Sequence, residues 1–342
     1  MPVDWNRRSV LKSLWAGLTA TLITSHRPPP IWGADPSPLQ QLGDVVRYHC
    51  QHQVQVRRNS TRLDSLELWL PVPINWPEQT ISALKISPQV TPVVAANSSA
   101  QVAKIIIADP RQLAAEEIRF QVSYDLQRRE TGSRRPDLIQ EKWQPYHLDS
   151  KEVRDSLAPE TLVQSQAAEI VQVATKIRGS QRPPGQVALD LYEWVLERTR
   201  YQFVEGFKGA EYCLREQHGE CGDYSALFVA LCRAAGIPAR GCVGYWAKGV
   251  NQYHVWAEFL MPSGEWIPVD TSIGDQNEKS RNYYFGGLDN NRITMMKSFD
   301  LELPQQLTGH ASLDFFQTGA CWYRGTGGTP SIEFTFTGET AG

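Results

Sequence analysis

The sequence predicts an α+β protein in which a small β-sandwich precedes a core of helices packed on an antiparallel sheet. Three observations predict this class. Short alternating runs separated by turn residues fill positions 43–129, helical periodicity begins near position 161, and two strands joined by a tight turn occupy 253–270. The 342 residues suffice for two domains, because a single core rarely grows beyond about 250–300 residues.

Composition and charge restrict the classes of function. Hydrophobic residues make up 41% and charged residues 21%, which is typical of a soluble globular protein, and the net charge is -3. We therefore expect no nucleic-acid partner, since nothing here attracts a polyanion. The six cysteines form no CxxC pair, and if one is a free nucleophile at most two disulfides can form, with a connectivity that the sequence does not define. We expect no cofactor and no bound metal.

Residues 1–34 read as a signal peptide. Arg7 and Arg8 precede an apolar run at 14–23 and a proline-rich exit. The run is shorter than the roughly 20 apolar residues that a membrane-spanning helix needs. The segment 6–12 resembles the twin-arginine export signal. We therefore expect a periplasmic or extracellular protein with no membrane span after signal removal. The alternatives are an uncleaved anchor and a flexible terminus without a targeting role.

The next segment, 35–135, is predicted to be a β-rich domain. Its strands have apolar residues at alternating positions or in short runs, and prolines or polar clusters end them. The clearest of these strands are 47–56, 66–70, 104–107 and 118–124. The polar stretch at 136–155 is interpreted as a linker. Two amphipathic helices with ordinary core faces follow, at 161–177 and 184–200.

A third helix begins at or just before Cys221 and ends at Gly236 and Pro238. At a helix N-terminus the unpaired N–H groups and the dipole favour a thiolate and can bind an oxyanion. Gly219 and Gly222 would leave room for a substrate backbone. A cysteine that only packs in the core is the alternative interpretation.

The strands 253–260 and 265–270 form a hairpin with a turn at 261–264. If its loop is centred on Pro262, His254 lies directly opposite Asp270 on one face. The carboxylate would then hold the imidazole in position and leave its other nitrogen for the Cys221 sulfur. A one-residue slip would remove this pairing. The alternatives are a histidine bonded to another neighbour and an aspartate that belongs to a turn.

The runs 219–240, 254–258 and 266–270 together resemble the catalytic core of the transglutaminase-like family. The resemblance implies a papain-like fold with a catalytic triad of Cys221, His254 and Asp270. We assign 156–275 to this core. The run 283–293 is similar to bacterial members, which implies that the extension 276–342 completes the catalytic sheet.

The resemblance also implies attack by the cysteine on an amide carbonyl, which gives a thioester acyl-enzyme. Water as acceptor would make the protein a peptidase or amidase acting on a peptide or protein, and this is the reading we favour. An amine as acceptor would make it a cross-linking acyltransferase. We expect Gly222, Tyr224 and Trp256 to contribute to the oxyanion site or the substrate groove.

Two other classes of function stay open. Cys213, His218 and Cys221 could supply three ligands to zinc, although the spacing lacks the usual CxxC geometry and leaves the hairpin pair unexplained. A non-catalytic module could use the aromatic residues near the site to hold a peptide without cutting it. Such a module has no need for all three triad residues.

Overall fold

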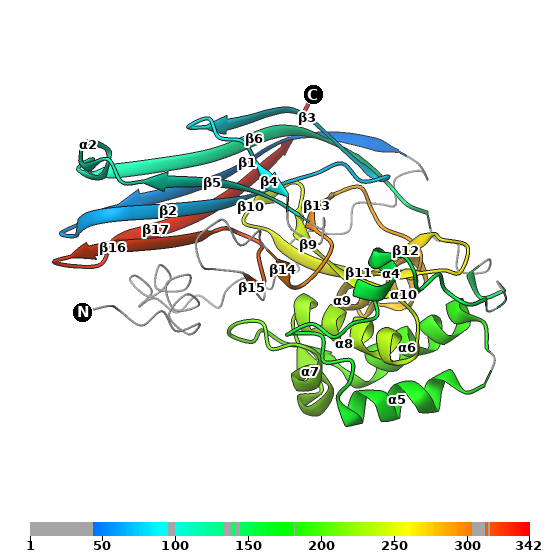
Figure 1. Ribbon diagram of the computed structural model, residues 1–342. Helices are drawn as coiled ribbons and strands as arrows, with labels where there is room; N and C mark the ends of the chain where they lie inside the picture. The colour runs from blue at the N-terminus through cyan, green and yellow to red at the C-terminus, as the bar shows by residue number, and fades with distance from the viewer. Residues whose placement is uncertain are drawn as a thin grey trace.

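The computed structural model describes residues 44–94, 100–132, 138–140, 142, 144–180, 182–302, 312–313 and 315–342. The expected signal peptide lies outside these residues. The strands of a β-sandwich form one end of the molecule, most of the helices form the other, and a four-stranded sheet lies between them (Figure 1). The predicted α+β class is confirmed. Within the described part of the chain, no helix is both long and apolar enough to cross a membrane.

The sandwich consists of two antiparallel sheets that enclose one apolar core. Its strands alternate between buried and more exposed residues, as the period of two for a strand requires. The larger sheet has the order β10 (Gly249–Val250), β17 (Ser331–Thr340), β1 (Val45–Arg57), β6 (Glu117–Arg129) and β3 (Gln79–Ser87). The other has the order β16 (Ala320–Thr326), β2 (Arg62–Val72), β5 (Gln101–Ile107) and β4 (Val93–Val94). A short helix, α2 (Pro110–Leu113), precedes β6.

The central sheet has the order β12 (Trp266–Val269), β11 (Tyr253–Leu260), β9 (Ala239–Trp246) and β13 (Arg292–Met296), and every pair is antiparallel. Val243, Val255 and Phe259 share one apolar cluster with the helices. Because side chains alternate along a strand, His254 and Glu258 project from the opposite face.

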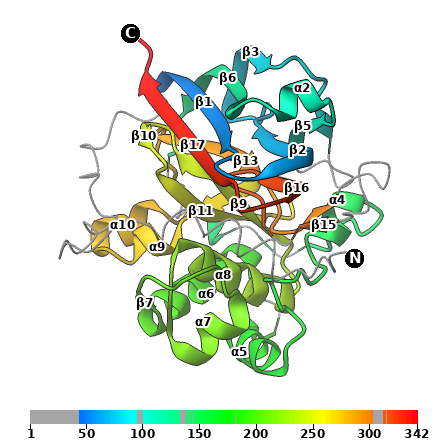
Figure 2. The same cartoon turned by 90° about the vertical axis from the view of Figure 1, so that its left-hand side faces the viewer.

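The helices cover one face of the central sheet (Figure 2). They are α5 (Ala168–Arg178), α6 (Pro184–Arg198), α7 (Ala210–Glu216) and α8 (Cys221–Ala234), with the short α4 (Lys151–Asp155), α9 (Thr271–Gly274) and α10 (Glu278–Tyr283) around them. A two-residue parallel pair, β7 (Arg200–Tyr201) with β8 (His218–Gly219), precedes α8. Helix α8 is buried over most of its length and packs against β11, which brings its first residue to the sheet.

The C-terminal strands differ from the prediction. We expected 276–342 to complete the catalytic sheet, but among the described strands of this extension only β13 pairs within the central sheet. β16 pairs with β2, and β17 pairs with β1 and β10, so the end of the chain completes the N-terminal sandwich. The short β14 (Leu301–Glu302) and β15 (Ser312–Leu313) pair with each other. The physical reason is that β1 and β2 would otherwise present unpaired backbone edges.

Candidate active site

Cys221 is the first residue of α8, as predicted. A capping box defines this start, because the Glu220 side chain accepts from the backbone of Asp223 while the Asp223 side chain accepts from the Glu220 N–H at 3.1 Å. The other carboxylate oxygen of Asp223 accepts from the N–H groups of Lys208 and Gly209, each at 2.9 Å. The sulfur atom is therefore carried on a helix end that is tied to the preceding loop.

The Cys221 thiol is half-buried, and its surroundings favour the protonated form. Burial raises its pKa to about 12, and the neighbouring Glu220 carboxylate acts in the same direction. The N–H groups of Val255 and Gly222 act in the opposite direction but do not compensate. We expected the helix N-terminus to favour the thiolate. The Gly222 N–H at the helix end acts in the expected direction, but desolvation and Glu220 act more strongly in the other.

His254 and Asp270 form the centre of the site. The His254 Nε2–H donates to Asp270 Oδ2 at 2.7 Å, and the Asp270 side chain has no exposed surface. The predicted direct opposition of the two residues is wrong by two positions, since Ala257 pairs with Val269. They nevertheless share a face, because an even offset preserves the alternation of a strand. β12 ends at Val269, and Asp270 caps α9 by accepting from the N–H of Ile273 at 3.0 Å.

The pKa values of His254 and Asp270 both lie below their ordinary values. Burial alone would raise the pKa of Asp270, but the charges of His254 and Arg292 bring it well below its ordinary value. Burial lowers the pKa of His254, and Asp270 only partly opposes this. The resting pair is therefore an aspartate and a neutral imidazole at pH 7. A neutral imidazole is the form that can accept a proton.

Cys221 lies beside the strand that carries the imidazole. The Val255 N–H is close enough to the sulfur to lower the thiol pKa, and Val255 directly follows His254. Among the described contacts, no hydrogen bond joins the Cys221 thiol to His254. The imidazole bonds Asp270 through Nε2, which leaves Nδ1 as the nitrogen for a proton from sulfur. In proteins without bound substrate such catalytic contacts are often long.

Sequence reasoning missed two residues that contact this pair. Arg292 Nη1 donates to Asp270 Oδ2 at 2.6 Å, so this oxygen accepts from both His254 and Arg292. The Trp246 ring stacks on the His254 ring with centroids 4.6 Å apart and an interplanar angle of 19°. The signal for Arg292 was present in the run 283–293, which the resemblance singled out without assigning it a role.

Of the three residues expected at the oxyanion site or groove, two have core side chains and Gly222 adjoins the cysteine. Tyr224 and Trp256 have no exposed surface, so the expectation that they line a groove is wrong. The Tyr224 hydroxyl donates to Asp275 Oδ2 at 3.0 Å, which makes it a core residue. A Cβ atom on Gly222 would lie 2.8 Å from the Phe207 ring, so the chain itself fills that space. A contribution of the Gly222 N–H to an oxyanion site stays a prediction.

The geometry gives the zinc hypothesis no support. Cys213 is buried in α7, and His218 Nε2 lies 2.9 Å from the Tyr212 hydroxyl. No group of three His, Cys, Asp or Glu side chains in the described part of the chain could hold a metal ion. All six cysteines are free thiols.

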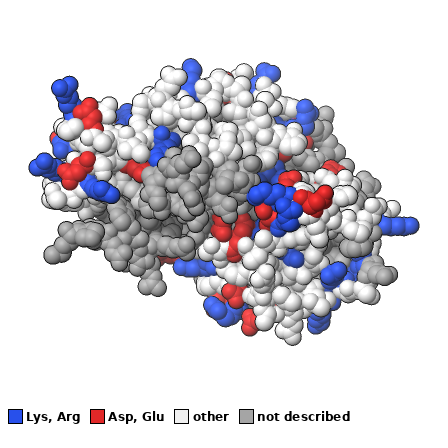
Figure 3. All heavy atoms as spheres, viewed as in Figure 1, with Lys and Arg blue, Asp and Glu red and all other residues white. Residues whose placement is uncertain are grey.

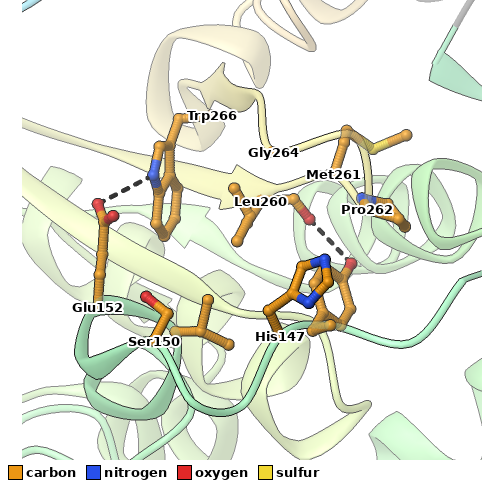
Figure 4. A pocket seen from close by; sticks show the side chains of 10 residues that line it. His147, Ser150, Glu152, Leu260, Met261, Pro262, Gly264 and Trp266 are labelled. Carbon is orange, nitrogen blue, oxygen red and sulfur yellow. Dashed lines mark hydrogen bonds between the residues drawn. The ribbon is translucent and has the colours of Figure 1, made fainter.

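A small pocket lies at the other end of β11, around the turn between β11 and β12 (Figure 4). Glu152 accepts from Trp266 Nε1 at 3.1 Å on one side of it. Its lining residues are Tyr146, His147, Ser150, Glu152, Val153, Leu260, Met261, Pro262, Gly264 and Trp266. Leu260 lies six positions after His254 on the strand, a distance of about 20 Å, so this pocket is not the site of the His–Asp pair.

Basic and acidic side chains are interspersed over the face in Figure 3.

Comparison with known proteins agrees with this fold. Residues 171–271 match the transglutaminase-like superfamily, so the chain carries a transglutaminase-like domain that includes Cys221, His254 and Asp270. A protein from Cytophaga hutchinsonii, described as a candidate cysteine protease, shares the fold with a TM-score of 0.55 and 15% identity over 87% of this chain and 91% of that chain. The periplasmic domain of TgpA from Pseudomonas aeruginosa, bound to ethylmercury, aligns with a TM-score of only 0.36 and 15% identity, over 70% of this chain and 94% of that one. No curated protein matches the sequence.

Proposed function

We propose that the protein is a cysteine hydrolase that cleaves amide bonds of peptides or proteins through Cys221, His254 and Asp270. The observation that carries this proposal is the buried 2.7 Å bond between His254 and Asp270, beside the helix start that presents Cys221. The carboxylate holds the imidazole through Nε2 and leaves Nδ1 for a proton from the thiol. The general logic is that of a nucleophile, a base and a residue that orients the base.

The charge states favour a proton transfer that accompanies attack. His254 Nδ1 takes the proton of the Cys221 thiol as the sulfur bonds to the amide carbon, and Asp270 stabilises the imidazolium that forms. N–H groups at the start of α8 stabilise the oxyanion. When the C–N bond breaks, the imidazolium gives its proton to the leaving amine and a thioester remains. His254 then deprotonates a water molecule that attacks the thioester, which releases the acid and restores the thiol.

The signal-like sequence at 1–34 supports an exported location for this activity. A peptide or protein substrate would then be met outside the cytoplasm.

Alkylation with iodoacetamide at pH 7 tests the nucleophile. Cys321 is the matched internal control, because it is the other cysteine that is only partly buried. We expect Cys221 to react faster than Cys321, and His254→Ala to slow the Cys221 reaction by about 100-fold while leaving Cys321 unchanged. Peptide mapping by mass spectrometry follows both sites. Equal rates at the two cysteines, or no effect of His254→Ala, would contradict the proposal.

Product analysis tests the acceptor. A peptide mixture incubated with the protein is compared by mass spectrometry with and without added hydroxylamine, and Cys221→Ser is the control. Free carboxyl products without hydroxylamine, absent with Cys221→Ser, support hydrolysis. Products that form only when an amine is present would show an acyltransferase instead.

A further inference from the structure

We propose that Arg292 is a positioning residue that shares the Oδ2 atom of Asp270 with His254 and thereby sets how strongly this carboxylate holds the protonated imidazole. The inference deepens the proposed function, because it concerns regulation of the same base. It starts from the position of Arg292 at the beginning of β13, the edge strand of the central sheet.

The guanidinium of Arg292 has no exposed surface and bridges two carboxylates. Nη1 donates to Asp270 Oδ2 at 2.6 Å, whereas Nε and Nη2 lie 2.9 Å and 2.8 Å from Asp289 Oδ2. The hydrogen bonds come from two nitrogens, Nη1 to Asp270 and Nε to Asp289, at fixed positions of one planar group. Arg292 is therefore held in one orientation relative to Asp270.

Aromatic rings enclose this guanidinium. Its carbon lies 4.4 Å from the centre of the Trp246 ring, and 5.4 Å from each of the Trp256 and Tyr284 rings. Trp246 is also the ring that stacks on His254. Because Trp246 contacts both groups, a displacement of the guanidinium would also disturb the ring that packs on the imidazole.

Two opposite charges act on His254 through this arrangement. Arg292 repels the protonated imidazole and therefore lowers the pKa of His254. Asp289 attracts the protonated imidazole and therefore raises this pKa. The other charged group that faces the ring is Asp270, after β12, and the Cys221 thiol lies beside Val255, the residue after His254. Substitutions of Arg292 and Asp289 should therefore shift the protonation of His254 in opposite directions.

The test is an NMR titration of the His254 ring in the full chain, with ¹⁵N-labelled histidine and assignment by the signal lost in His254→Gln. We expect Arg292→Gln to raise the His254 titration midpoint by about one pH unit or more, and Asp289→Asn to lower it. Arg292→Lys keeps the cation and should stay closer to the wild-type midpoint than Arg292→Gln. Asp275→Asn is the matched control, because Asp275 bonds Tyr224 and not this pair, and should leave the midpoint unchanged.

Midpoints that stay in place, or that move in the same direction in Arg292→Gln and Asp289→Asn, would overturn the inference and leave Arg292 a structural residue. If Arg292→Gln does not fold, Asp289→Asn decides alone: a lowered midpoint supports the inference, and an unchanged or raised one overturns it. The titration is repeated with Cys221→Ser, which shows whether the His254 midpoint is independent of the thiol. A failure of the proposed hydrolase function would appear in the alkylation experiment and not here.

Discussion

At the scale of single residues, the site depends on one buried carboxylate, both oxygens of which accept hydrogen bonds from the protein. Asp270 Oδ2 accepts from His254 and Arg292, and Oδ1 accepts from the Ser272 hydroxyl at 3.1 Å and from the Ile273 N–H. These bonds compensate the cost of burying the charge. They also fix the plane of the carboxylate, and with it the orientation of the imidazole.

Asp270→Asn tests this role. The amide keeps the shape of the side chain but loses the charge that stabilises the imidazolium. We expect the rate of Cys221 alkylation to fall by about 10- to 1,000-fold, because the loss of a neighbouring carboxylate lowers the pKa of the imidazolium by about one to three. Iodoacetamide labelling at pH 7 measures it, and the Cys321 rate should not change. A Cys221 rate equal to that of the wild type would show that the carboxylate does not act on the thiol.

At the scale of elements, the close approach of β9 and β13 brings Arg292 to Asp270. Gly244 on β9 pairs with Thr294 on β13, and a Cβ atom on Gly244 would lie 1.8 Å from the carbonyl oxygen of Ile293. Only a residue without a side chain permits this backbone contact. Since Ile293 follows Arg292, any separation of the strands moves the guanidinium away from the carboxylate.

Gly244→Ala should therefore destabilise the protein by about 1–3 kcal/mol, as overpacking usually does, and should also slow Cys221 alkylation. Urea unfolding and labelling measure the two effects. Gly264→Ala is the control: its φ of +90° disfavours a side chain, but nothing lies within 4 Å of the new Cβ atom. It should leave the labelling rate unchanged. Unaltered stability and labelling in Gly244→Ala would show that the strands can separate freely.

At the scale of the whole molecule, buried charges connect the sandwich to the central sheet. Glu258 on β11 pairs with Lys297 and Arg240, each at 2.8 Å, and Lys297 also reaches Glu78, next to β3, at 3.1 Å. Burial alone would raise the pKa of Glu258, but the charges of Lys297 and Arg240 lower it to about 2. Gln317 adds a second connection, because its Nε2 donates to the backbone oxygen of His254 at 3.2 Å.

Glu258→Gln should cost about 3–5 kcal/mol at pH 7, because Lys297 and Arg240 lose their buried partner and keep only Glu78 and Glu152. The folded-state pKa lies below the unfolded value of about 4.3. The stabilisation by Glu258 is therefore fully present above the unfolded value and is lost as the pH falls toward 2. Urea unfolding of both proteins between pH 7 and 3 should show the difference shrinking below about pH 4.3. Glu197→Gln, at an exposed pair with Arg198, is the control and should change little.

Much of the site could be predicted because its parts are encoded locally. The polar cluster before an apolar helical run predicted that α8 starts at Cys221, and the alternation of 253–260 and 265–270 predicted that His254 and Asp270 share a face. The exact register was wrong, because a hydrophobic pattern repeats every two residues and cannot distinguish shifts of two. Tyr224 and Trp256 were wrongly expected at the groove, because the sequence does not show whether an aromatic side chain lines a groove or packs in the core.

The sequence by itself determined the α+β class, the order of cysteine, histidine and aspartate along the chain, and the local elements that carry them. Only the tertiary structure decided that β16 and β17 complete the sandwich, that burial raises the pKa of the Cys221 thiol, and that Arg292 reaches Asp270. The physical reason is that helix starts and strand faces depend on neighbouring residues. Strand partners, burial and the electrostatic environment of a thiol depend on segments that meet only after the chain has packed.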